Sequence, residues 1–129
     1  MGIIYNFQPI LMLFLLKIGN KMVFVIDLDH TLCNTEKKNN GDWDYLNSQP
    51  LQERITKVNS LFEKGNTIII ETARGCNSKY NWYLETYQQL ITWGLKFHHL
   101  RTGVKYAADY YIDDKAINAD DFFKDKKWE

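Results

Sequence analysis

The chain has 129 residues, 45% of them hydrophobic and 25% charged, which is typical of one globular domain and excludes a disordered chain. Its 16 basic and 16 acidic residues give a formal net charge of zero, so it lacks the basic excess with which nucleic-acid-binding proteins neutralise phosphates. Two cysteines, Cys33 and Cys76, are too few for a disulfide framework and favour a reducing, cytoplasmic location.

An apolar run, Ile10 to Leu16, lies near the N-terminus. It is too short for a stable membrane span, which needs about 20 apolar residues. No Lys or Arg precedes it, as a signal peptide would require, although a signal peptide or membrane association of residues 1–21 stays an open alternative. Because Met22 directly precedes the first strand-like segment, we expect residues 1–21 to be a dispensable extension or a mis-assigned start, and residues 22–129 to form the functional domain.

The first elements in chain order are a strand, a loop and a helix. Val23 to Asp27 is a continuous apolar run, as in a strand buried on both faces. The polar stretch from Asn34 to Gln49 predicts a loop. Helical spacing of apolar residues follows Pro50 and ends at Gly65, a residue suited to a helix C-terminus.

A second strand, Thr67 to Glu71, precedes a second helical pattern. Asn77 or Ser78 can cap the start of this helix and Gly94 its end. Its apolar face is expected in the core and comprises Tyr80, Tyr83, Leu84, Tyr87, Leu90 and Ile91.

Two further strands and a short helix complete the prediction. The strands are Phe97 to Leu100 and Tyr110 to Asp113, and the helix is Asn118 to Phe123. Alternating strands and helices indicate an α/β fold with a mainly parallel sheet. Right-handed crossovers then predict a three-layer, Rossmann-like core with helices on both faces.

Reactive polar residues follow the predicted strands. Asp27 and Asp29 follow the first, Thr72 the second, and the pair Asp113 and Asp114 the last, while Lys105 stands in the loop before that last strand. Ligands of open α/β sheets bind at the carboxyl ends of the strands. These residues are therefore expected to converge on one site.

Their chemical types suit phosphoryl transfer. A carboxylate can attack phosphorus to form an aspartyl-phosphate, and Mg²⁺ binds carboxylates together with phosphate oxygens. A second carboxyl group two residues on can act as general acid and base. A hydroxyl and an ammonium can stabilise the phosphoryl charge. Each residue alone has an ordinary structural explanation, so the hypothesis depends on the whole set.

The set resembles the four motifs of the haloacid dehalogenase (HAD) superfamily, in family order. The motifs are Asp27-Leu28-Asp29-His30-Thr31, the strand ending in Thr72, Lys105, and Ile112-Asp113-Asp114. The resemblance implies that Asp27 is the nucleophile and Asp29 the general acid and base. It also implies that Asp27, the backbone carbonyl of Asp29 and Asp114 hold Mg²⁺ with support from Asp113, and that Thr72 and Lys105 bind the phosphoryl group.

A narrower resemblance concerns small HAD phosphatases linked to capsule polysaccharide biosynthesis. It is carried by Asp-Leu-Asp-x-Thr-Leu-Cys33, Gly41-Asp42-Trp43, Thr72-Ala73-Arg74-Gly75 and Ile112-Asp113-Asp114-Lys115-Ala116. It implies that the substrate is a sugar phosphate or another small phosphate ester. His30 stands where that motif commonly has Gly.

The spacing of the motifs leaves no room for a sizeable cap domain. Arg74 is a further phosphate-binding candidate, and Asp42, Trp43 and Tyr45 in the segment after the first motif are candidate substrate contacts. Trp43 can equally be a loop residue packed on the core. An open site suits a large substrate or a homo-oligomer in which a neighbouring subunit completes the pocket.

Two alternatives stay open, a polynucleotide-end phosphatase and a catalytically inactive phosphate-binding protein of the same fold. The neutral charge argues against the first. The filled chemical positions argue against the second. A phosphate-accepting receiver domain has its Lys after the acidic residues, so the order of Lys105 and Asp113 excludes it.

Overall fold

The computed structural model describes residues 21–129, and the apolar run near the N-terminus lies outside the described residues. Its helices and strands in chain order are β1 (Val23–Ile26), β2 (Cys33–Asn34), the 3₁₀ helix η1 (Tyr45–Asn47), β3 (Gln49–Pro50), α3 (Gln52–Glu63), β4 (Thr67–Thr72), α4 (Tyr83–Thr92), β5 (His99–Thr102), α5 (Ala119–Lys124) and the 3₁₀ helix η2 (Lys126–Trp128). None of these helices is long and apolar enough to span a membrane.

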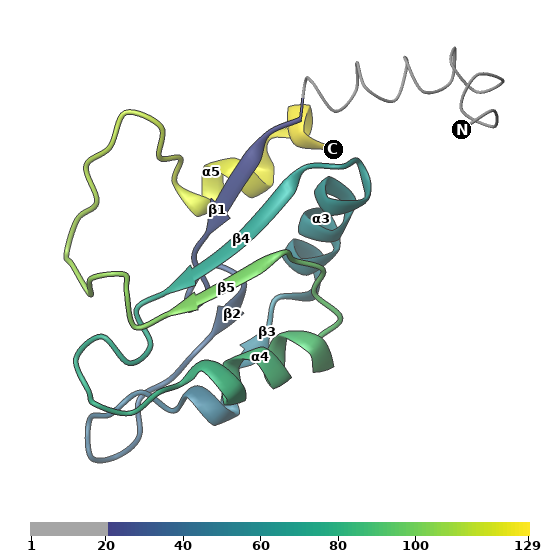
Figure 1. The fold of residues 1–129 in the computed structure, drawn as a ribbon. Helices are drawn as coiled ribbons and strands as arrows, with labels where there is room; N and C mark the ends of the chain where they lie inside the picture. Colours follow the sequence, from purple (N-terminus) through teal and green to yellow (C-terminus); the bar gives the residue numbers. More distant parts are fainter. Residues whose placement is uncertain (1–20) are drawn as a thin grey trace, which may run out of the picture.

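The main sheet has three parallel strands in the order β1-β4-β5 (Figure 1). Ile26 pairs with Ile70, and Ile70 pairs in turn with Leu100, so β4 is central and all three strands end at one edge. A small antiparallel ladder joins β2 to β3. The expected α/β class with a mainly parallel sheet is confirmed, and residues 21–129 contain no large cap domain.

The core lies on one face of this sheet. Alternate strand residues Ile26, Ile70 and Leu100 are buried there, and helix residues from α3 and α4 pack over them: Ile55, Val58, Leu61 and Leu90. Among residues 21–129 nothing covers the opposite face of β1, where Val23 and Val25 are 64% and 60% exposed, so the expected burial of this strand on both faces is wrong.

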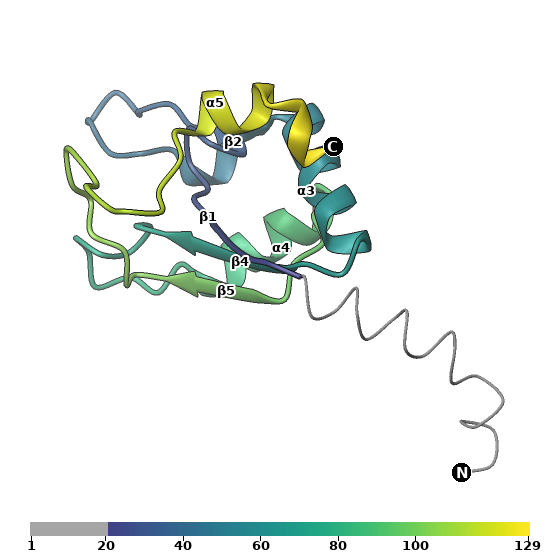
Figure 2. The same ribbon diagram turned by 90° about the horizontal axis from the view of Figure 1, so that it is seen from above.

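Helices were expected on both faces, but the described residues place them on one. Figure 2 shows α3 and α5 on the same side of the strands. The physical reason is the strand order. Because β1, β4 and β5 follow one another in a single direction, right-handed crossovers bring α3 and α4 to the same face.

Both predicted helix ends occur at glycine. Gly65 follows α3 with a φ of 94°, and its N–H donates to the Phe62 carbonyl. Gly94 follows α4 with a φ of 75°, and its N–H donates to the Ile91 carbonyl. Positive φ angles favour glycine because it has no Cβ.

The predicted apolar face of the second helix is largely wrong. The helix begins at Tyr83, after Asn81 accepts a hydrogen bond from the Tyr83 N–H, so Tyr80 precedes it. Only Leu90 of the expected set is buried, together with Thr86. The five expected core residues that are exposed instead are Tyr80, Tyr83, Leu84, Tyr87 and Ile91. A helix that packs on one face of a three-stranded sheet buries only a narrow stripe of its surface. The apolar face of α4 is wider than that stripe, so most of its apolar residues stay exposed.

The predicted strand Tyr110 to Asp113 is also wrong. This segment belongs to a long loop between β5 and α5, which swings out beyond the carboxyl ends of the strands (Figure 1). Ile112 is 98% exposed. Local contacts occupy the segment instead: Tyr111 lies under the Lys105 ammonium, and Asp113 accepts from the Lys115 N–H.

Smaller shifts affect three other predictions. The expected loop from Asn34 to Gln49 contains η1 and the pairing of β2 with β3 closes its base. The third strand is His99–Thr102 instead of Phe97 to Leu100, and the last helix is Ala119–Lys124. We refer below to residues 35–48 as the flap.

Candidate active site

The turn after β1 carries the two carboxylates of the first motif. Leu28 and Leu32 are fully buried and anchor it. The Leu28 carbonyl accepts hydrogen bonds from the N–H groups of Thr31, Leu32 and Cys33. Apolar residues thus alternate with Asp27 and Asp29, and the carboxylates are held at the rim of the core.

His30 takes a conformation that usually favours glycine. Its φ is 64°, and within the described range it is the single non-glycine residue with a positive φ. Its ring packs edge-on against Trp43, with 5.2 Å between the ring centroids. This contact offsets part of the steric cost of the left-handed conformation and ties the flap to the turn.

Asp27 has a cation and a hydroxyl beside it. The Lys105 ammonium lies 2.9 Å from Asp27 Oδ1, and the Thr31 hydroxyl donates to Oδ2 at 3.1 Å. Thr72 ends β4 at the same edge of the sheet, where its Oγ1 accepts from the Arg74 N–H. The structure therefore pairs Lys105 directly with Asp27 and sets Thr72 at the neighbouring strand end.

Asp29 forms a two-point ion pair with Arg74. Arg74 Nε donates to Oδ2 at 2.9 Å and Nη2 donates to Oδ1 at 2.8 Å, while Thr35 donates to Oδ1 at 2.5 Å. Burial alone would raise the pKa of Asp29, but the hydrogen bonds and charge of Arg74, together with hydrogen bonds from Thr35 and Cys33, outweigh burial and lower the pKa below its usual value of 3.8. Asp29 is consequently a carboxylate at neutral pH.

Cys33 adjoins this carboxylate. Burial, and next the negative charge of Asp29, raise the pKa of its thiol to about 11. A thiolate is the reactive form, so at pH 8 we expect a disulfide reagent to modify the partly exposed Cys76 quickly and Cys33 only after unfolding. Thiol release measured over time checks this, with Cys76→Ser removing the fast phase. Rapid reaction of both thiols would contradict it.

Asp113 and Asp114 lie exposed on the long loop. Residues 21–129 contain no group of three or more His, Cys, Asp or Glu side chains that could hold a metal ion. Asp27 is bound by Lys105 and Asp29 by Arg74. The magnesium ligands implied by the motifs are two carboxylates, of Asp27 and Asp114, and the backbone carbonyl of Asp29, so this magnesium site stays a prediction.

The flap carries the remaining candidates. Asp42 lies at its tip, exposed, where Asn40 donates to its carboxylate. Trp43 is half-exposed, between the His30 ring and the Lys37 ammonium, which lies 5.0 Å from the Trp43 ring centroid. Trp43 thus packs on the turn of the first motif and keeps one side open to solvent.

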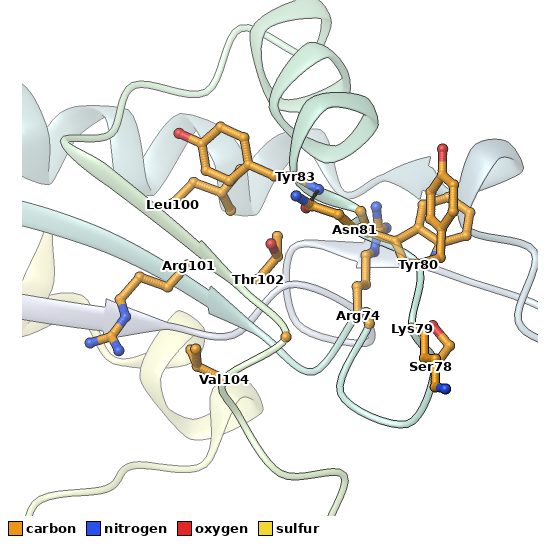
Figure 3. Close-up of a pocket in the computed structure, with 13 residues that line it drawn as sticks. Arg74, Ser78, Lys79, Tyr80, Asn81, Tyr83, Leu100, Arg101, Thr102 and Val104 are labelled. Carbon is orange, nitrogen blue, oxygen red and sulfur yellow. Dashed lines mark hydrogen bonds between the residues drawn. The ribbon is translucent and has the colours of Figure 1, made fainter.

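A cleft of about 470 Å³ opens beside this site (Figure 3). It lies between the loop after β4 and the end of β5, and its polar and aromatic lining includes Ser78, Lys79, Asn81, Trp82 and Thr102. Neither Asp27 nor Asp29 lines it. The cleft adjoins their site through Gly103, two residues before Lys105, and through Arg74, which lines the cleft although its side chain is 1% exposed and pairs with Asp29.

Gly75 sits where the walls of the cleft meet. Its φ is 88°, and a Cβ there would lie 2.9 Å from the Tyr80 carbonyl oxygen. Gly41 has a similar φ of 91° but open space around it. We expect Gly41→Ala to lower the free energy of unfolding by roughly 1–2 kcal/mol, the cost of a left-handed conformation, and Gly75→Ala to lower it further. Urea unfolding measures both, and equal losses would contradict the close approach.

Sequence reasoning missed the polar residues that surround Asp29 and Arg74. These are Thr35, Ser48, Thr86 and Gln89, and the first three are buried. Their one sequence signal is Thr86, a polar residue in the middle of an apolar helix. Thr35 and Ser48 lie in a segment whose composition predicts only an exposed loop.

Comparison with known proteins supports the fold. A structural-genomics target from Vibrio cholerae superposes with a TM-score of 0.65 at 24% identity, covering 79% of this chain and 87% of that one. A second Vibrio cholerae structure, named provisionally as a 3-deoxy-D-manno-octulosonate 8-phosphate phosphatase, has a TM-score of 0.40 at 19% identity, covering 69% of this chain and 45% of that one. That score is too low to carry an argument. No family model and no curated protein matches the chain.

Proposed function

We propose that the chain hydrolyses phosphomonoesters with Asp27 as the nucleophile. The observation that carries the proposal is the ion pair between Lys105 and Asp27, whose atoms lie 2.9 Å apart. It lies at the carboxyl-end edge of the sheet, where Thr72 is the last residue of β4. A carboxylate held beside an ammonium and a hydroxyl suits attack on phosphorus, because the cation can turn to the phosphoryl oxygens as charge develops.

Two steps follow from these residues. An Asp27 oxygen attacks phosphorus and the bond from phosphorus to the ester oxygen breaks, which forms an aspartyl-phosphate and an alcohol whose oxygen takes its proton from solvent water. Water then attacks this phosphorus, its proton passes to a carboxylate, and phosphate departs from a regenerated Asp27. Asp29 is ionised by its pairing with Arg74, so it fits the acceptor of that proton.

The cleft beside the site supports a small phosphate ester as the substrate. Its volume of about 470 Å³ lies within the usual range of small-molecule sites, and its mixed lining suits a hydroxylated leaving group such as a sugar. Asp42 and Trp43 at the flap are the other candidate contacts. Magnesium dependence stays a prediction of the motif resemblance, and neither step above relies on it.

The test is an assay of purified protein residues 1–129 against an aryl phosphate and then a panel of sugar phosphates, nucleotides and 5′-phosphorylated oligonucleotides, each with magnesium and with chelator. We expect turnover of small esters and an acid-stable phosphorylated peptide containing Asp27 after rapid quenching. Phosphate binding without turnover of any ester would overturn hydrolysis in favour of a phosphate-binding protein. Preference for oligonucleotides would favour the polynucleotide-end phosphatase.

A further inference from the structure

The Arg74 side chain is 1% exposed and has no free hydrogen-bond donor. A guanidinium has five N–H donors, and here each has an acceptor. Nε and one N–H of Nη2 donate to Asp29, and the other N–H of Nη2 donates to Ser48 at 3.2 Å. The two N–H groups of Nη1 donate to Thr86 at 3.3 Å and to Gln89 at 2.7 Å. A phosphoryl group would have to displace these acceptors to reach Arg74.

These contacts join three separate segments. Asp29 belongs to the turn after β1, Ser48 to the flap, and Thr86 and Gln89 to α4. Further bonds close the network, because Gln89 Nε2 also donates to the Tyr45 carbonyl at 2.6 Å. The Tyr45 ring packs on the guanidinium at 4.7 Å.

Asp29 has little freedom within this network. Arg74 occupies both of its carboxylate oxygens, and Thr35, which itself contacts Ser48 at 2.6 Å, bonds to one of them. The planar fork of arginine matches the two carboxylate oxygens, whereas a lysine offers one point of charge. The geometry therefore fixes the plane of the Asp29 carboxylate as well as its charge.

We propose that Arg74 is a positioning residue: it orients Asp29 for proton transfer and joins that carboxylate to the flap and α4, and it does not bind the substrate phosphoryl group. The proposal replaces the phosphate-binding role expected from the sequence. It rests on the proposed hydrolysis for its kinetic consequences, and on the contacts alone for its structural ones.

The kinetic test is a double-mutant cycle of Arg74→Lys and Asp29→Asn. Arg74→Lys keeps the positive charge but loses the two parallel hydrogen bonds to the Asp29 carboxylate. We therefore expect kcat to fall roughly 10- to 100-fold, with KM and the inhibition constant for inorganic phosphate unchanged. In the Asp29→Asn background the same change should cost less than about threefold, because the residue it orients is already lost. A rise in KM and in the phosphate inhibition constant, with kcat retained, would overturn the proposal.

A second variant guards against misfolding of Arg74→Lys. Gln89→Ala removes an acceptor of Arg74 and the bond to the Tyr45 carbonyl, but it contacts neither carboxylate. We expect kcat to fall about three- to tenfold with KM unchanged. A Gln89→Ala enzyme with unchanged kcat would show that the network does not orient Asp29.

A measurement independent of turnover separates this proposal from the proposed function. In NMR spectra at neutral pH, the buried Arg74 Nε–H should exchange slowly with water, shift in Asp29→Asn, and stay unchanged when inorganic phosphate is added. Arg101, whose side chain is 58% exposed, supplies the fast-exchanging control. A phosphate-induced shift at Arg74 would overturn the positioning role, even for a protein that hydrolyses no ester.

Discussion

Replacing Asp27 with Asn is expected to lower kcat for an aryl phosphate by about 10⁴-fold or more. The amide has the shape of the carboxylate and lacks the anionic oxygen that forms the bond to phosphorus. It also removes one charge of the pair with Lys105. Steady-state kinetics measures the loss, and the quenched phosphopeptide should disappear with it.

The control for this variant is Asp121→Asn, which makes the same chemical change at an exposed position of α5. Its kcat should match that of the wild type. Asp27→Asn should also retain the wild-type unfolding midpoint to within a small shift, because Asp27 lies at the rim and not in the core. Activity surviving in a folded Asp27→Asn protein would rule out Asp27 as the nucleophile.

Replacing Asp29 with Asn is expected to lower the free energy of unfolding by about 3–5 kcal/mol at pH 7. The change leaves the Arg74 guanidinium buried without its counter-charge, which is the costly way to break a buried ion pair. Urea unfolding followed by tryptophan fluorescence measures the loss. The matched control is Asp120→Asn, which breaks the exposed pair with Arg54 and should change stability little.

The same variant predicts a pH dependence. Because the folded-state pKa of Asp29 lies below 3.8, its contribution is present above pH 3.8 and is lost as the pH falls through the folded-state value. The stability difference between wild type and Asp29→Asn should therefore be constant from about pH 5 to 7 and narrow below pH 3.8. A difference that is already small at pH 7 would contradict a paired, buried Asp29.

The sequence predicts elements well where the signal is local. Gly65 and Gly94 end their helices because their positive φ angles are a property of single residues. The strand at Thr67 to Glu71 follows from its own composition, although only its alternate residues are buried, and the two carboxylates of the first motif do follow β1 at its carboxyl end. These predictions need no knowledge of distant neighbours.

The predictions that failed depend on contacts with residues far away in the sequence, and local composition does not specify those contacts. Tyr110 to Asp113 has the composition of a strand, but a strand forms only beside another, and the part of the chain that the structure describes offers this segment no partner strand. Tyr83 and Tyr87 have the spacing of a buried face, yet they stack on each other outside the core. The phosphate-binding role expected for Arg74 stays untested, and the positioning role proposed above depends on contacts with Asp29, α4 and the flap that its place two residues after Thr72 does not indicate.

The strand order also bears on how the site would come apart. Among residues 21–129, β4 is paired on both sides, while β1 is hydrogen-bonded on one side only and its outer face is uncovered. Amide exchange should therefore be slowest in β4 and faster in β1, where local opening needs fewer bonds to break. Asp27 follows β1, the strand expected to open more easily, whereas Thr72 ends β4, the strand expected to open last. In mild denaturant, the proposed nucleophile Asp27 would therefore separate from its partners while most of the fold remains intact, and activity would be lost before global unfolding.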